Sequence, residues 1–296
     1  MAGKKDRDRK RARERYERQR AERVQRRNKI RQRAGIGFAV VLVIGLAVGL
    51  TLALPGGGST KASSKPTTSH SASASPSASA SATPSVSTIA EPAQHCTYTK
   101  SGTAAKPVSL PSASPDYKGT YTATINTNLG KIDINLLNSK ATCAVNSFIH
   151  LASAGFWDSS QCHRVTTQGG LYVLQCGDPY AQATKKLTCS SAAGSPGTGG
   201  PGYEFESENL KGATYKAGTV AMANSGSADS NGSQFFLVYK NSTLQPDYTP
   251  FGTITSGLDI LQKVAKAGIT CEYSSDPGDG APKEKVIIDS VTIKKT

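Results

Sequence analysis

The sequence lacks the patterns that mark metal and nucleotide sites. It contains no CxxC pair, and its four histidines, at positions 70, 95, 150 and 163, do not cluster. Zinc sites need several His or Cys ligands at close spacing, so neither a metal nor a cofactor is expected. The glycine-rich stretch 194–203 has neither a GKS or GKT ending nor GxGxxG spacing. It is therefore predicted to be a surface loop rather than a phosphate cradle.

A thiol nucleophile is not indicated either. Cys162 stands beside His163, but no acidic residue is in view that would orient the histidine. All six cysteines follow residue 95, which suits an oxidising exterior and predicts structural disulfides. Six cysteines allow too many pairings for the sequence to choose among them.

Positive charge is concentrated at one end of the chain. Residues 1–33 hold 16 Lys or Arg and 5 Asp or Glu; since the whole chain has a net charge of +14, the rest carries only +3. This segment has good helix formers but no apolar face, and we expect a solvated tail that lies against anionic lipid headgroups. RNA binding is the weaker alternative, because Tyr16 is the only aromatic residue available for stacking there.

An uncharged run of 21 residues, 34–54, follows the basic tail. At a rise of about 1.5 Å per residue, such a helix is long enough to cross a bilayer. The basic residues before it place the N-terminus in the cytoplasm. We expect an uncleaved, single-pass anchor in the cell membrane, with the C-terminal bulk outside the cytoplasm. A cleaved signal peptide is the alternative, but its charged region is normally short and no convincing small-x-small cleavage site precedes Pro55.

Residues 55–92 form a predicted disordered linker. Between Ser59 and Thr88, 26 of 30 residues are Ser, Ala, Thr or Pro. This composition offers too little apolar surface to fold, so the segment would act as a spacer. Residues 93–117 are rich in prolines and small residues and are predicted to be an irregular lead-in, pinned through Cys96.

Residues 118–296 are predicted to form a mainly β domain. Apolar and polar residues alternate on both sides of the turn 127–130, which is a hairpin signal. Amphipathic helices are expected at 141–154, ended by Gly155, and at 257–267. The expected strands are 121–125, 131–136, 161–165, 171–178, 219–225, 233–239, 249–254 and 286–293. This pattern predicts a closed eight-stranded barrel with two capping helices, and a β-sandwich is the alternative from pattern alone.

Arg164 lies in one of these apolar strands and needs an explanation. A guanidinium is always charged, and removing it from water costs free energy unless an interaction with a partner compensates. Taken alone, the residue favours a structural ion pair or a strand-edge charge. The alternative is a functional arginine that acts on a bound partner.

Six short motifs follow one another in a particular order. They are CHRV at 162–165, LQCGDP at 174–179, GTGGPGY at 197–203, MAN at 222–224, NGSQFF at 231–236 and FG at 251–252. Over roughly residues 118–295 the chain thereby resembles the cyclophilins, a family of peptidyl-prolyl cis-trans isomerases. Its loops are most similar to those of bacterial members.

The resemblance implies an eight-stranded antiparallel barrel with an outer groove that binds a proline-containing peptide. By these motifs Arg164 matches the catalytic arginine, and Gln175 matches the glutamine that follows it. Asn224 matches the backbone clamp on the substrate, and Phe236 matches the floor of the proline pocket. The implied substrate-binding residues are Tyr172, Val173, Gln175, Ala223, Asn224, Ser225, Gln234, Phe236, Leu244 and Tyr248.

The chain also departs from the family pattern. Between Arg164 and Gln175 it has a few residues more than usual, so Tyr172 is matched to the family's phenylalanine across an insertion. The loop 180–195 is longer than common. Thr243 stands where many eukaryotic members carry a tryptophan that binds cyclosporin, and Tyr248 stands where they carry a histidine. Weak cyclosporin binding at most is therefore expected.

The expected function is peptidyl-prolyl cis-trans isomerisation in secreted or envelope proteins. Arg164 would donate a hydrogen bond to the proline nitrogen of the twisted amide, a step that needs neither a metal nor proton transfer. The alternative is a chaperone or adaptor that binds proline-containing peptides with little turnover.

Overall fold

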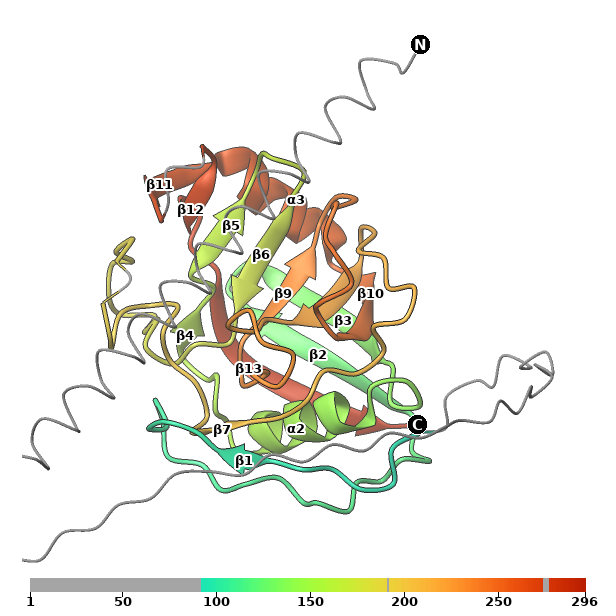
Figure 1. Cartoon of the computed structure of the whole chain (residues 1–296). Helices are drawn as coiled ribbons and strands as arrows, with labels where there is room; N and C mark the ends of the chain where they lie inside the picture. Colours follow the sequence, from blue (N-terminus) through green and yellow to red (C-terminus); the bar gives the residue numbers. More distant parts are fainter. Residues whose placement is uncertain (1–91, 191, 274–276) are drawn as a thin grey trace, which may run out of the picture. The chain divides into compact units, whose positions relative to one another are not determined.

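The computed structural model of the chain describes residues 92–190, 192–273 and 277–296 (Figure 1). The predicted basic tail, the predicted membrane segment and nearly all of the predicted linker lie outside these residues. In the part that is described, no helix combines the length and the apolar character that a membrane span requires. The division of the chain into five segments stays a prediction.

The described fold is mainly β with two helices, as predicted. An antiparallel sheet of eleven strands carries most of it, and β1 (Thr99–Lys100) and β7 (Tyr203–Glu204) form a second, two-stranded sheet. The helices are α2 (Thr142–Ser153) and α3 (Leu258–Ala267). The strands of the large sheet are β2 (Tyr121–Thr127), β3 (Gly130–Leu136), β4 (Ser160–Gln161), β5 (Arg164–Thr166), β6 (Val173–Cys176), β8 (Thr219–Met222), β9 (Phe235–Val238), β10 (Pro250–Ser256), β11 (Ile269–Glu272), β12 (Asp279–Pro282) and β13 (Ile287–Lys295).

The prediction of a closed eight-stranded barrel is wrong in strand count and in closure. The paired order is β11-β12-β5-β6-β9-β8-β10-β3-β2-β13-β4, and among the described residues no ladder joins its two ends. The reason lies in the segment 160–166, which is interrupted at Cys162 and His163. Its first part, β4, pairs with β13, whereas its second part, β5, pairs with β6. The added hairpin β11–β12 then occupies the other edge of β5.

Hydrophobic packing of aromatic rings holds α2 against the sheet. The ring of Phe148 on α2 lies 5.5 Å from that of Phe235 and 5.1 Å from that of Phe251. Trp157, just after the helix, is fully buried in the same core. As predicted, α2 ends before Gly155, whose φ of 56° is a conformation that glycine adopts without strain. The helix thereby fixes the face of the sheet that is closed to solvent.

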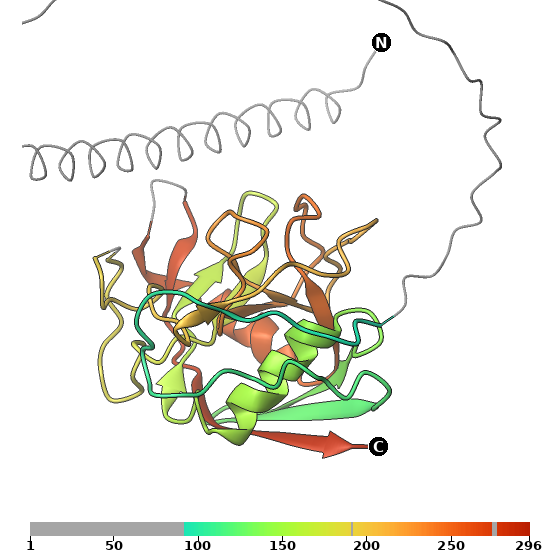
Figure 2. The same ribbon diagram turned by 60° about the horizontal axis from the view of Figure 1, so that its bottom comes forward.

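The lead-in 92–117 runs alongside α2 (Figure 2). A disulfide joins Cys96 to Cys143 in the first turn of the helix. The ring of Tyr98 packs edge-on against Tyr203 and Phe205, each at 5.6 Å, and its hydroxyl donates to the carbonyl of Cys143. The carboxylate of Glu208 accepts from the backbone N–H groups of Cys143 and Ala144, which caps the start of α2.

Candidate active site

Three neighbouring strands place the predicted site residues in one row. Arg164 on β5 lies opposite Gln175 on β6, and Gln175 lies opposite Phe236 on β9. Residues that are directly opposite in antiparallel strands point to the same face of the sheet. The strand register therefore aligns the guanidinium, the amide and the aromatic ring side by side.

The polar members of this row are joined by hydrogen bonds. Arg164 donates through Nη1 to Oε1 of Gln175 over 3.0 Å, and Gln175 donates through Nε2 to Oε1 of Gln234 over 2.9 Å. Gln234 in turn donates through Nε2 to the carbonyls of Gly197 and Gly199, at 3.0 and 2.8 Å. The glycine-rich loop, predicted only to be a surface loop, thus contacts the site directly.

Asp178 holds that loop in place and was missed by sequence reasoning. Its Oδ2 accepts from the backbone N–H groups of Gly197 and Gly199, at 2.6 and 2.9 Å. Burial raises the pKa of this carboxyl, while the backbone hydrogen bonds oppose the shift. Its Oδ1 accepts from the nearby N–H of Tyr180, but its partners in the glycine-rich loop lie about twenty positions further along the chain, where no local pattern could reveal them.

Asp279, at the start of β12, grips the guanidinium from its other side. Nε of Arg164 donates to Oδ1 and Nη2 donates to Oδ2, both at 2.7 Å. Burial would lower the pKa of the guanidinium, but the carboxylate outweighs burial and the pKa is raised. The structural ion pair considered from the sequence therefore exists. The Arg164 side chain nevertheless remains 30% exposed, which leaves part of it accessible to a ligand.

An apolar cluster lies next to this row, and we call it the Phe236 cluster. It brings together five predicted residues: Val173, Ala223, Phe236, Leu244 and Tyr248. Leu171, Ala213, Tyr215, Ala221 and Val238 complete it, none of which was predicted. The rings of Tyr215 and Tyr248 lie 6.2 and 5.5 Å from that of Phe236. Ala223, Leu244 and Tyr248 are only partly buried, so the cluster presents apolar surface to solvent.

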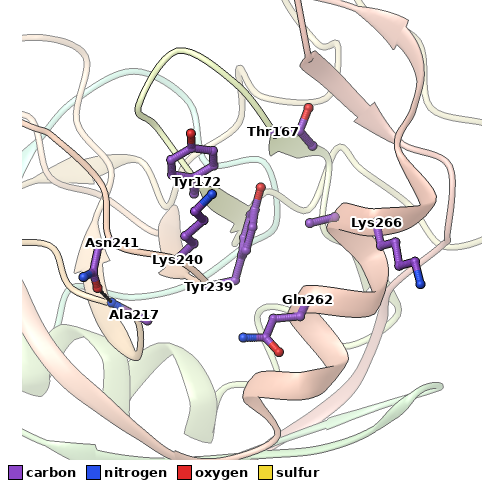
Figure 3. Close-up of a pocket in the computed structure, with 9 residues that line it drawn as sticks. Thr167, Tyr172, Ala217, Tyr239, Lys240, Asn241, Gln262 and Lys266 are labelled. Carbon is purple, nitrogen blue, oxygen red and sulfur yellow. Dashed lines mark hydrogen bonds between the residues drawn. The ribbon is translucent and has the colours of Figure 1, made fainter. Parts of the chain in front are cut away.

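The structure does not bring Tyr172 into the Phe236 cluster. Its ring lies 6.0 Å from that of Tyr239, and the Lys240 ammonium lies 4.5 Å above it. Together with Thr167 and residues of α3, these side chains line a separate cavity of about 580 Å³ (Figure 3). The cause is the alternation of side chains along an extended segment, which puts residues 171 and 173 on one face and residue 172 on the other. That rule, applied from Val173, would have selected Leu171.

The remaining predicted residues lie at the end of β8. Asn224 donates through Nδ2 to the carbonyl of Asp247 at 2.8 Å and accepts at Oδ1 from the N–H of Gly226. This side chain is thereby engaged in holding the loop, which is compatible with a role for its backbone. Ser225 is exposed, and its N–H donates to the hydroxyl of Ser230. The role of both residues in binding stays a prediction.

The six cysteines form three disulfides. They join Cys96 to Cys143, Cys162 to Cys176, and Cys189 to Cys271. The second links the residue two before Arg164 to the residue after Gln175, so it fixes the strand pair that carries the site. Within the described ranges, no group of three or more His, Cys, Asp or Glu side chains could hold a metal ion.

The chain is similar to several known proteins. The family model described as cyclophilin type peptidyl-prolyl cis-trans isomerase/CLD matches residues 122–293. A protein of Mycobacterium leprae, named probable peptidyl-prolyl cis-trans isomerase B, is 43% identical over 215 residues, which cover 67% of this chain and 66% of that protein. Its namesake in Mycobacterium tuberculosis is 40% identical over 215 residues, covering 67% of this chain and 64% of that protein. A peptidyl-prolyl cis-trans isomerase of Helicobacter pylori is 36% identical over 151 residues, or 50% of this chain and 82% of that protein.

The protein is thus a β-sheet protein whose site lies on one face of the sheet. In that site the polar side chains of Arg164 and Gln175 lie beside the apolar ring of Phe236. The chain belongs to the cyclophilin-type peptidyl-prolyl cis-trans isomerase family. It spans just under two thirds of the length of the two mycobacterial proteins.

Proposed function

We propose that this protein is a peptidyl-prolyl cis-trans isomerase that accelerates rotation about X-Pro bonds. The observation that carries the proposal is the juxtaposition of a partly exposed guanidinium with an apolar cluster. Arg164 has five N–H groups, of which Asp279 and Gln175 engage three. The other two remain available to a peptide.

The chemistry follows from the electronic structure of the amide. Rotation about a peptide bond costs about 18–20 kcal/mol because the C–N bond has partial double-bond character. When the X-Pro bond is twisted, resonance is lost and the proline nitrogen gains a lone pair. A hydrogen bond from Arg164 to this lone pair exists only in the twisted state, so it lowers the barrier without tightening either ground state.

The Phe236 cluster binds the proline ring, which is the part of the peptide that stays fixed during rotation. The proline ring packs on Phe236, with Leu171 and Leu244 beside it, while the carbonyl of the preceding residue swings. Gln175 and the backbone of Asn224 bind the peptide on either side of the rotating bond. Rotation about the bond is a unimolecular step with or without the protein, so holding one half in place helps by directing the binding energy of the peptide to the twisted form.

The substrates we propose are proline-containing segments of secreted or envelope proteins. Three disulfides in one domain favour an oxidising compartment. The proposed location is the cell membrane, with residues 34–54 as a single span, the basic tail in the cytoplasm and the catalytic domain outside. With Tyr248 in the Phe236 cluster and Thr243 directly before Leu244 in the sequence, cyclosporin binds weakly at most.

A second function is a chaperone or adaptor that binds proline-containing peptides with little turnover. The observation that favours it is the Arg164–Asp279 salt bridge, because the carboxylate neutralises the charge that the isomerase mechanism uses. Peptide binding on the Phe236 cluster would persist in that case, while the rate would not rise.

The test is the rate of cis-trans exchange in a short Ala-Pro peptide with the purified full chain. Arg164→Ala is expected to lose about 100-fold in kcat/KM, as when a single donor to a transition state is removed. Lys263→Ala is the matched control, since this cation lies on the exposed face of α3 with 78% of its side chain accessible. A wild-type rate at background with intact peptide binding would establish the chaperone instead. Equal rates for wild type and Arg164→Ala would refute the mechanism.

A further inference from the structure

Arg164 is the only arginine that follows residue 33 in this chain. Its partner Asp279 lies 115 positions away, on the strand that pairs with the other edge of β5. Asp279 is opposite Thr166 in that ladder, two residues beyond Arg164. The carboxylate is therefore placed by backbone hydrogen bonds of the sheet and has a side-chain exposure of only 17%.

The geometry of the contact restricts the guanidinium more than a single bond would. Both carboxylate oxygens accept at 2.7 Å, one from Nε and the other from Nη2. A planar guanidinium held along one edge by two parallel bonds cannot rotate in its plane or tilt out of it without losing one of them. The adjacent edge, formed by Nη1 and Nη2, consequently points in one direction. Gln175, which takes a single bond from Nη1, would leave the group free to swing.

The strand that bears Asp279 is itself well anchored. The N–H of Thr167 donates to the carbonyl of Gly278 at 2.8 Å, which ties the extra residues after Arg164 to the start of β12. The N–H of Tyr273 donates to the carbonyl of Asp279, and the disulfide between Cys189 and Cys271 fixes the neighbouring β11. The extra residues after Arg164, the loop that contains Cys189 and the β11–β12 hairpin are thus linked to one another and together hold Asp279 in place.

We propose that Asp279 is a positioning residue for Arg164: it holds the Nε–Nη2 edge so that the Nη1–Nη2 edge faces the nitrogen of a bound X-Pro peptide. This inference rests on the proposed isomerase function. Asp279 does not contact the peptide and acts through Arg164 alone. Its loss therefore slows the rotation step and leaves peptide binding on the Phe236 cluster intact.

The kinetic test compares Asp279→Asn with Asp289→Asn in the full chain. Asp289 is an exposed residue on β13 and serves as the matched control. For Asp279→Asn we expect kcat to fall about 10- to 100-fold, the scale of a small misplacement of a catalytic group, with KM within twofold of wild type. In an Arg164→Ala background the same change is expected to add nothing, because the residue through which it acts is gone. A rise in KM with kcat unchanged would overturn the proposal. An equal loss of kcat in the wild-type and Arg164→Ala backgrounds would also overturn it.

A spectroscopic test separates failure of this inference from failure of the proposed function. The Nε–H signal of Arg164 is assigned in ¹⁵N spectra by its loss in Arg164→Lys. Asp279→Asn is expected to shift and broaden it, and Asp289→Asn to leave it in place. An unchanged signal overturns the inference whether or not the wild type is an active isomerase. Circular dichroism checks folding, and Asp279→Ser replaces the Asn variant if that one does not fold.

Discussion

Gln175 donates to Gln234 across 2.9 Å, and Arg164 sets the direction of this bond. An arginine can only donate, so Oε1 of Gln175 must accept and its Nε2 must face the next residue. Gln234 then accepts at Oε1 and turns its own Nε2 toward the carbonyls of Gly197 and Gly199. One guanidinium thus orients two amides and a loop that lies on a different part of the chain.

Gln175→Glu reverses this polarity. A carboxylate accepts from Arg164 but has no hydrogen to donate to Gln234, so two oxygen atoms face each other. We expect kcat/KM to fall about tenfold, which corresponds to about 1.4 kcal/mol and is the scale of one lost hydrogen bond. The X-Pro exchange assay measures it. Gln262→Glu, on the exposed side of α3, introduces the same charge and should change little; an equal loss there would point to net charge as the cause.

Leu171 and Tyr172 offer a direct comparison, because they are neighbours on opposite faces. Leu171→Ala removes apolar surface from the Phe236 cluster and should weaken the binding of a proline peptide by about 1–2 kcal/mol. Tyr172→Ala should leave the affinity within twofold, since its ring packs with Tyr239. Titration of the peptide by calorimetry measures both. If Tyr172→Ala weakened peptide binding more than Leu171→Ala did, Tyr172 rather than Leu171 would be the residue that contacts the peptide.

Local sequence patterns predicted the β2–β3 hairpin and both helices, but not the β11–β12 hairpin that carries Asp279. The hairpin of β2 and β3 and both helices lie where alternation and amphipathic spacing indicate, since these signals involve residues close in sequence. The hairpin of β11 and β12 was missed, because Asp279-Gly280-Ala281-Pro282 contains poor strand formers and pairs only through tertiary context.

The candidate site shows the same division. Ordered motifs selected Val173, Phe236, Leu244 and Tyr248, which do gather in one cluster. Asp178 and Asp279 could not be selected, because the glycine-rich loop and Arg164 are distant in sequence and come close to them only in the folded domain. The insertion after Arg164 also obscured which of two adjacent residues shares a face with Val173, and only the strand register settles that.

The disulfide between Cys189 and Cys271 closes a large loop, with a sequence separation of 82. Replacing both cysteines by serine should lower the free energy of unfolding by about 4.5 kcal/mol on the chain-entropy scale. Removing Cys162–Cys176, with a separation of 14, should cost about 3 kcal/mol on the same scale. Urea unfolding of each double variant measures the difference. If the shorter loop cost clearly more, strand pairing near Arg164 rather than loop length would dominate.

His163 makes stability depend on pH. The side chain is 1% exposed, and within the described structure neither ring nitrogen has a hydrogen-bond partner. Burial, aided by the charge of Arg164, lowers the pKa of His163 to about 3, whereas an unfolded histidine has a pKa of about 6.5. Between these values only the unfolded state takes up the proton, so stability falls as pH drops from 6.5 toward 3.

His163→Gln removes this titration. Its melting temperature should fall less than that of wild type between pH 7 and pH 4, whatever its value at pH 7. The exposed His95→Gln is the control and should follow wild type. Parallel curves for His163→Gln and wild type would show that other groups govern the acid sensitivity. Differential scanning calorimetry at several pH values provides the measurement.

The bond between Cys96 and Cys143 also has a mechanical consequence. Any tension in the chain that precedes residue 92 enters the domain at Cys96 and passes covalently to the first turn of α2. That turn is held by Glu208 and by the aromatic core beneath it. Of the strands that carry the site, β9 contacts this path through Phe235, the neighbour of Phe236, whereas β5 with Arg164 makes none of these contacts. A pull on the attached chain would therefore load the helix first and reach the site only through the core beneath it.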